Sequence, residues 1–89
     1  MVSLRMNATH RKTLSAIFAK PAKADVRREA IDALFIACGA EIAEGPGSRV
    51  RILLNGVEAV FHRPHPHPVA DKGALKSVRR FLSEAGIEP

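Results

Sequence analysis

Two arginines and a histidine are the side chains whose types and spacing could together do chemistry. Asn55-Gly56 predicts a tight hairpin, because a type I′ turn needs positive φ at both central residues. Counting outward from that turn places Arg49 directly opposite His62, with Arg51 two residues further along the first strand. Side chains alternate across a sheet, so all three share one face. Guanidinium groups bind anions and an imidazole can exchange a proton, so function is expected on this face.

The opposite face of the predicted hairpin must be the core. Its members are apolar and alternate with the polar ones: Val50, Ile52, Leu54, Val57, Ala59 and Phe61. Leu53 and Val60 remain on the face of the two arginines. An exposed apolar pair beside charged residues indicates a protein interface, unless another part of the chain or a second copy covers it.

Two helices are predicted before the hairpin. The first runs from about Thr9 to Ala19, with Asn7 or Thr9 as N-cap, and ends at Lys20-Pro21. The second begins at the N-cap Asp25 and is closed by Gly39. Its predicted buried stripe consists of Val26, Ala30, Ala33, Leu34, Ala37 and Cys38, and Arg28, Glu29 and Asp32 are expected on its wet side.

The remaining elements follow from turn residues and prolines. Residues 40–44 predict a short strand with Ile42 inward, followed by the turn at residues 45–48. Alternating prolines make residues 63–68 an extended loop, and Asp71 caps a last helix that runs to about Ala85 and stops at Gly86. The order is helix, helix, three strands, helix. We therefore expect an α+β fold, with two helices stacked on one face of an antiparallel sheet.

Charge points to an anionic partner. The 89 residues make one small domain with a formal net charge of +5, for which nucleic acid is the first candidate and simple solubility the alternative. The last helix collects Lys72, Lys76 and Arg79 on one side, with Arg80 nearby, and phosphate contacts are favoured there over a merely wet face. Lys76 and Arg79 are both expected to face solvent.

Cellular context follows from what the sequence contains. The single cysteine, Cys38, indicates no disulfide framework and is expected to be a small buried hydrophobe. No segment approaches the ~18 apolar residues of a membrane span, and the first residues lack the apolar core of a signal peptide. A cytoplasmic location and no membrane partner are therefore expected.

The element order, together with Gly47-Ser48-Arg49, Gly73-Ala74-Leu75 and Ala85-Gly86-Ile87, resembles the HicA family of toxins from bacterial toxin–antitoxin systems. The resemblance divides the chain into an N-terminal extension with a helix, residues 1–23, and a HicA-like domain, residues 24–89. It implies an α-β-β-β-α fold like the double-stranded-RNA-binding domain, and a metal-independent endoribonuclease that acts on mRNA without a cofactor. It also implies a cognate HicB-like antitoxin as partner.

One motif departs from the family pattern. Arg49 stands where the family has its catalytic histidine, and a guanidinium cannot accept a proton from a ribose 2′-hydroxyl. His62, across from Arg49, is the preferred replacement, with Arg49 and Arg51 holding the phosphate; His65 in the proline loop is the runner-up. A metal bound by His62, His65 and His67 is not expected, because the prolines splay them and no carboxylate or thiol completes the set.

Three functions remain open at this stage. The chain could be a HicA-type ribonuclease with a displaced histidine, or a non-catalytic RNA-binding module, which Arg49 favours. It could also be a protein-interaction domain whose charge serves only solubility.

Overall fold

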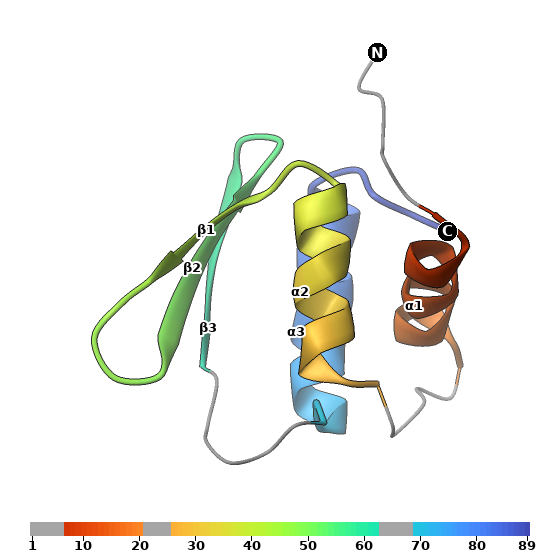
Figure 1. Ribbon diagram of the computed structural model, residues 1–89, viewed down its shortest axis with the longest axis horizontal. Helices are drawn as coiled ribbons and strands as arrows, with labels where there is room; N and C mark the ends of the chain where they lie inside the picture. The colour runs from red at the N-terminus through yellow and green to blue at the C-terminus, as the bar shows by residue number, and fades with distance from the viewer. Residues whose placement is uncertain (1–6, 21–25, 63–68) are drawn as a thin grey trace.

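The computed structural model describes residues 7–20, 26–62 and 69–89, which form three layers (Figure 1). A three-stranded antiparallel sheet in the order β1-β2-β3 is the first layer, and α2 and α3 cover one of its faces. Helix α1 lies on the far side of these two helices. The elements are α1 Ala8–Phe18, α2 Arg28–Ala37, β1 Glu41–Glu44, β2 Arg49–Leu54, β3 Val57–His62 and α3 Lys72–Glu84. The predicted α+β fold with a helix, three strands and a helix is confirmed, with α1 added in front.

The predicted hairpin register is confirmed. Arg49 pairs with His62 and Arg51 with Val60, around a turn in which Asn55 has φ 50° and Gly56 φ 80°. The turn is also tied to the end of α3, because the Asn55 side chain donates a hydrogen bond of 2.8 Å from Nδ2 to the carbonyl oxygen of Ala85. That bond satisfies a carbonyl at the end of a helix, where no intrahelical donor remains. The hairpin is therefore fixed against α3 at its tip.

The predicted buried stripe of this region is confirmed at Val26, Leu34 and Cys38 and is wrong at Ala33. The buried residues are Ile31, Leu34, Phe35 and Cys38, whereas Ala33 is exposed. This spacing puts two large side chains into the core in place of alanines, and burial of apolar area favours that rotation. The predicted N-cap Asp25 lies outside the described residues. The observed helix begins at Arg28, and its N-cap Arg27 makes no side-chain capping bond.

An aromatic cluster joins the sheet to both covering helices. The ring centroid of Phe35 lies 6.1 Å from that of Phe61 and 5.7 Å from that of Phe81, and the Phe61 and Phe81 centroids are 5.6 Å apart. Phe61 was expected to be buried but is only half-buried, because β3 is an edge strand of the described sheet. The cluster packs β3 against both covering helices and leaves Phe61 partly accessible.

Helix α1 belongs to the same core as the rest of the chain. Its N-cap is Asn7, one of the two predicted, and its Leu14 and Ile17 are 2% and 0% exposed within the common hydrophobic cluster. Arg79 of α3 donates hydrogen bonds to the carbonyl oxygens of Ile17 (3.0 Å, from Nε) and Ala19 (3.3 Å, from Nη2). The expectation that Arg79 faces solvent is therefore wrong: its guanidinium closes the C-terminal end of α1, where backbone acceptors lack helical partners.

The single thiol is also part of this core. Cys38 is 2% exposed, and burial raises the pKa of its thiol above the ordinary value. It packs as a small hydrophobe, as expected. Among the described residues, no helix combines the length and the apolar character that crossing a membrane requires.

Candidate functional site

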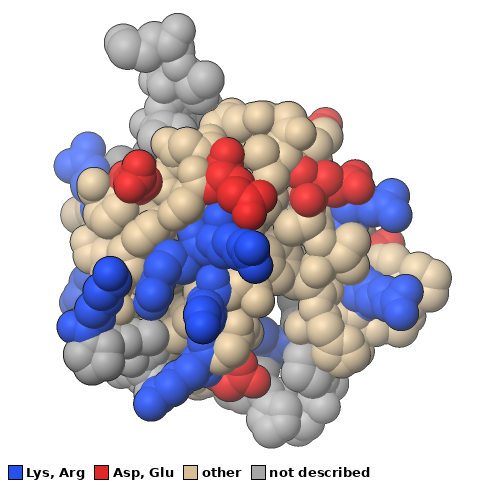
Figure 2. Space-filling model, turned by 180° about the vertical axis from the view of Figure 1, so that it is seen from behind, with Lys and Arg blue, Asp and Glu red and all other residues tan. Residues whose placement is uncertain are grey.

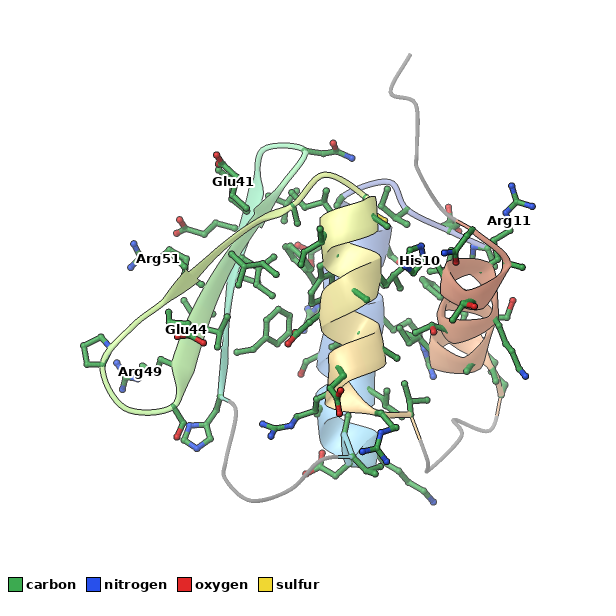
Figure 3. All side chains as sticks on the ribbon, viewed as in Figure 1. His10, Arg11, Glu41, Glu44, Arg49 and Arg51 are labelled. Carbon is green, nitrogen blue, oxygen red and sulfur yellow. The ribbon has the colours of Figure 1, made fainter. Side chains whose placement is uncertain are left out.

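The open face of the sheet carries the two predicted arginines. Arg49 and Arg51 are exposed and project from the side of the sheet that faces away from the helices (Figure 3). Together with Glu44 of β1 and Val60 of β3 they line a hollow of about 310 Å³. Arg51 also lies 3.9 Å from Glu58, an exposed ion pair of small energetic value. Both guanidinium groups are therefore reachable by an anion approaching this face.

His62 is the last residue of β3 and lies where two surfaces meet. It is exposed and is the register partner of Arg49 on the open face. It also lines a groove of about 640 Å³ that runs between β3 and α3. The apolar part of this groove is formed by Ala59, Val60, Phe61, Ala74 and Phe81. The arrangement brings His62 and Arg49 together as predicted, because directly opposed residues have Cβ atoms ~4.5–5.5 Å apart.

The starts of α2 and α3 lie side by side at the same end of the molecule as the C-terminal end of β3, whose last residue is His62 (Figure 1). The amide of Ala70 donates to the carbonyl oxygen of Val26 at 3.0 Å, and Arg27 and Val69 form an isolated antiparallel bridge. Arg28 follows directly and lines the groove together with His62. Sequence reasoning put Arg28 on the wet side of its helix and gave it no role, and no signal in the sequence distinguishes it from its neighbour Arg27.

Arg28 has an unusual environment. Within the part of the chain that the structure describes, its Nε and Nη1 are the buried side-chain nitrogen or oxygen atoms that have no hydrogen-bond partner. A buried donor without a partner costs free energy, and a buried charge costs more. No described carboxylate accepts a hydrogen bond from these two nitrogens. The guanidinium is therefore a source of positive potential at the groove that His62 also lines.

The basic side of α3 is smaller than predicted. Lys72 and Lys76 are exposed, and Arg80 is exposed but lies 3.5 Å from Glu84 one helical turn away. The guanidinium of Arg79 already donates its hydrogen bonds to carbonyl oxygens at the end of α1. Figure 2 shows Lys and Arg side chains gathered on this face of the molecule, with a band of acidic side chains above them. Lys72 and Lys76 therefore remain accessible to an anionic partner.

The expectations about the alternative base and about a histidine metal site involve residues that the structure does not describe. His65, the alternative base, and His67 lie in residues 63–68, outside the described part of the chain. Among the residues that are described, no group of three or more His, Cys, Asp or Glu side chains could hold a metal ion.

Comparison with known protein families gives a match over most of the chain. The family model described as HicA toxin of bacterial toxin–antitoxin matches residues 28–87. The match begins at the first residue of α2 and leaves α1 outside. Comparison with curated proteins and with solved structures gives no match.

Proposed function

Because the chain belongs to the HicA family of bacterial toxins, we propose that it is a toxin that cleaves mRNA without a metal, with His62 as its acid–base group. Membership of this family also implies a cognate antitoxin as partner. The observation that carries the proposal is the pairing of His62 with Arg49, the residue at the position of the family's histidine. An imidazole on the neighbouring strand can serve the same phosphate that a histidine at position 49 would serve.

The proposed chemistry is transfer of the RNA phosphate to the neighbouring 2′-oxygen. His62 takes the proton of the ribose 2′-hydroxyl, the 2′-oxygen forms a bond to phosphorus, and the bond from phosphorus to the 5′-oxygen breaks. The departing 5′-oxygen takes a proton from solvent, and a cyclic phosphate remains. Arg49 and Arg51 offset the charge that develops on the phosphate oxygens, which is the role that fixed cations serve best in such reactions.

Lys72 and Lys76 would hold the flanking RNA backbone. Double-stranded-RNA-binding domains recognise RNA by shape and by contacts to phosphates and 2′-hydroxyls, so lysines at a helix start suit that task.

For the antitoxin, a HicB-like protein, we propose that the binding surface is the open face of the sheet. Val60 and Leu53 are 56% and 38% exposed there, beside the arginines. An antitoxin on this face would cover the cleavage site directly.

The experiment is induced expression of the wild type and of His62→Ala in a bacterial host, followed by growth and by cleavage of purified RNA. The wild type should arrest growth and cleave RNA, and His62→Ala should lose about 100-fold or more of the cleavage rate. A chelator should not change the rate. Retained cleavage in His62→Ala, combined with loss in His65→Ala, would move the base into the proline loop.

A non-catalytic RNA-binding function is the second candidate, and Arg49 favours it because a guanidinium cannot act as a base. In that case the wild type binds RNA but cleaves none at any protein concentration. Wild type and His62→Ala then show no difference in RNA cleavage. Arg49→His in the His62→Ala background tests the link between the two positions. Recovery of cleavage in this double variant would show that both side chains reach the same phosphate.

A further inference from the structure

We infer that Arg28 holds the scissile phosphate of the RNA in the groove between β3 and α3, next to His62. This inference rests on the proposed function and adds to it a residue that the family pattern and the sequence reasoning did not assign. It places the phosphate at the end of β3, where the open face of the sheet and the groove meet at His62.

The first argument is the state of the Arg28 side chain. Its Nε and Nη1 are buried and have no hydrogen-bond partner, although a guanidinium is always charged. In a packed protein, buried donors of this kind are normally paired, because leaving them unpaired costs free energy. A phosphate oxygen supplies both the missing acceptor and the missing negative charge. Hydrogen bonds of this kind often tighten only when the ligand binds, so the free protein need not show them formed.

The second argument is that each acidic residue lining the groove, in the part of the chain that the structure describes, already has a partner. Glu58 lies 3.9 Å from Arg51, Glu84 lies 3.5 Å from Arg80, and Asp71 accepts a 2.7 Å hydrogen bond from the amide of Ala74. In the small adjoining pocket Asp32 is also engaged. None of these contacts involves Arg28, so its Nε and Nη1 can donate to an incoming anion.

The third argument is geometry. Arg28 and His62 line not only the groove but also a second, smaller pocket of about 60 Å³ beside Phe61 and Ala70, so both residues border the same two hollows at the point where β3 ends. The starts of α2 and α3 are tied together at that point, and α2 has no side chain capping its first amides. Helix starts carry positive partial charge, which adds to that of Arg28. A phosphate bound by Arg28 would therefore lie within reach of the proposed base.

The test compares Arg28→Met with Arg27→Gln in the full chain. Arg27 is the adjacent cation, but its side chain is 59% exposed, lies 3.5 Å from Glu29 and lines neither pocket. We expect Arg28→Met to lower the single-turnover cleavage rate about 100-fold, as for loss of one donor to a developing oxyanion. Arg27→Gln should stay within about threefold of the wild type, as suits an exposed ion pair. Equal rates in the two variants would overturn the inference.

Stability separates this role from a structural one. If Arg28 supported the fold, Arg28→Met would lower the melting temperature. If it is kept for the phosphate, the variant should melt at the same temperature or higher, because methionine fills the space without a buried charge. Inorganic phosphate should raise the melting temperature of the wild type more than that of Arg28→Met. A variant that melts lower and shows the same response to phosphate would contradict the inference.

Binding distinguishes failure of this inference from failure of the proposed function. RNA with 2′-O-methyl riboses cannot be cleaved by attack of the 2′-oxygen, so it reports binding alone. Arg28→Met should reduce the slope of log affinity against log salt by about 0.7, the value for one phosphate contact on a single strand, and Arg27→Gln should not change it. If the wild type cleaves no RNA but shows this difference, the nuclease proposal fails and Arg28 stands. If it cleaves and the slopes agree, Arg28 fails alone.

Discussion

Arg79 and Arg28 are both half-buried arginines on the helices that cover the sheet, and their surroundings are opposite. Arg79 lies where α1 meets α3, and its guanidinium donates to two backbone carbonyl oxygens at the end of α1. Arg28 lies at the start of α2 beside the groove, and two of its nitrogens have no partner. Arg79 therefore connects α3 to α1, whereas Arg28 keeps donors that no other part of the described chain uses. Our proposal is that the contact made by Arg79 serves stability and that the free donors of Arg28 serve a ligand.

The same contrast extends to the surrounding packing. At the junction of α1 with α3, apolar side chains of α1 are fully enclosed and the helix end is closed by Arg79. At the groove, Phe61 is left half-buried and β3 has a free edge in the described sheet. Ligand-binding sites are commonly the places where buried groups lack partners and strand edges stay free. Residues are kept there for function, at some cost in stability.

The largest effect should come from opening the junction. Ile17→Ala removes a side chain that is 0% exposed, and truncations of this kind cost about 2–5 kcal/mol of unfolding free energy. Ile36→Ala is the matched control, because Ile36 on α2 is 64% exposed and its loss should cost less than about 0.5 kcal/mol. Urea unfolding measures both. Equal losses would mean that α1 is not part of the common core.

The next effect concerns the arginine at the junction. Arg79→Met should lower the unfolding free energy by about 1.5–3 kcal/mol, the range for loss of hydrogen bonds made by a charged group. Arg80→Met is its control, because the exposed pair of Arg80 with Glu84 is worth only about 0.3–0.5 kcal/mol. If Arg79→Met is as stable as Arg80→Met, the comparison with Arg28 loses its basis.

Much of the fold could be predicted from the sequence, because local chemistry determines it. Asn55-Gly56 fixes the turn and hence the register, which places His62 opposite Arg49 without knowledge of any distant contact. Asp71 and Gly86 likewise mark the two ends of α3 correctly. These signals act within a few residues, so they can be identified in a single sequence.

The errors concern contacts between residues far apart in the chain. Arg79 and Ile17 are 62 positions apart, and nothing on the face of α3 reveals that α1 needs a donor there. Arg28 could not be told from Arg27, because its environment is made by β3 and α3 together. The half-burial of Phe61 has the same origin. Alternation in a strand gives the face of a residue, but whether the strand lies at an edge depends on the assembled sheet.

A smaller effect should follow from the exposed cations of α3. Replacing Lys72 and Lys76 together with alanine should reduce the slope of log RNA affinity against log salt by about 1.4, which corresponds to two phosphate contacts on a single strand. Both side chains are exposed, so the unfolding free energy should change little. Fluorescence anisotropy over a series of salt concentrations measures the slope. An unchanged slope would leave only the arginines to bind RNA.

The smallest effect concerns Cys38, at the end of α2 opposite to Arg28. Burial raises the pKa of its thiol above the ordinary value of 9.0, so the unfolded chain loses this proton at a lower pH than the folded one. The thiol's contribution to stability is therefore complete below pH 9.0 and declines as the pH rises through that value. The chain has no tyrosine, and its lysines are common to both proteins compared. The advantage of the wild type over Cys38→Ala in urea unfolding should shrink between neutral and alkaline pH. An advantage that stays constant or grows with pH would mean that the thiol is accessible, and that this end of the helix is less tightly closed than the packing indicates.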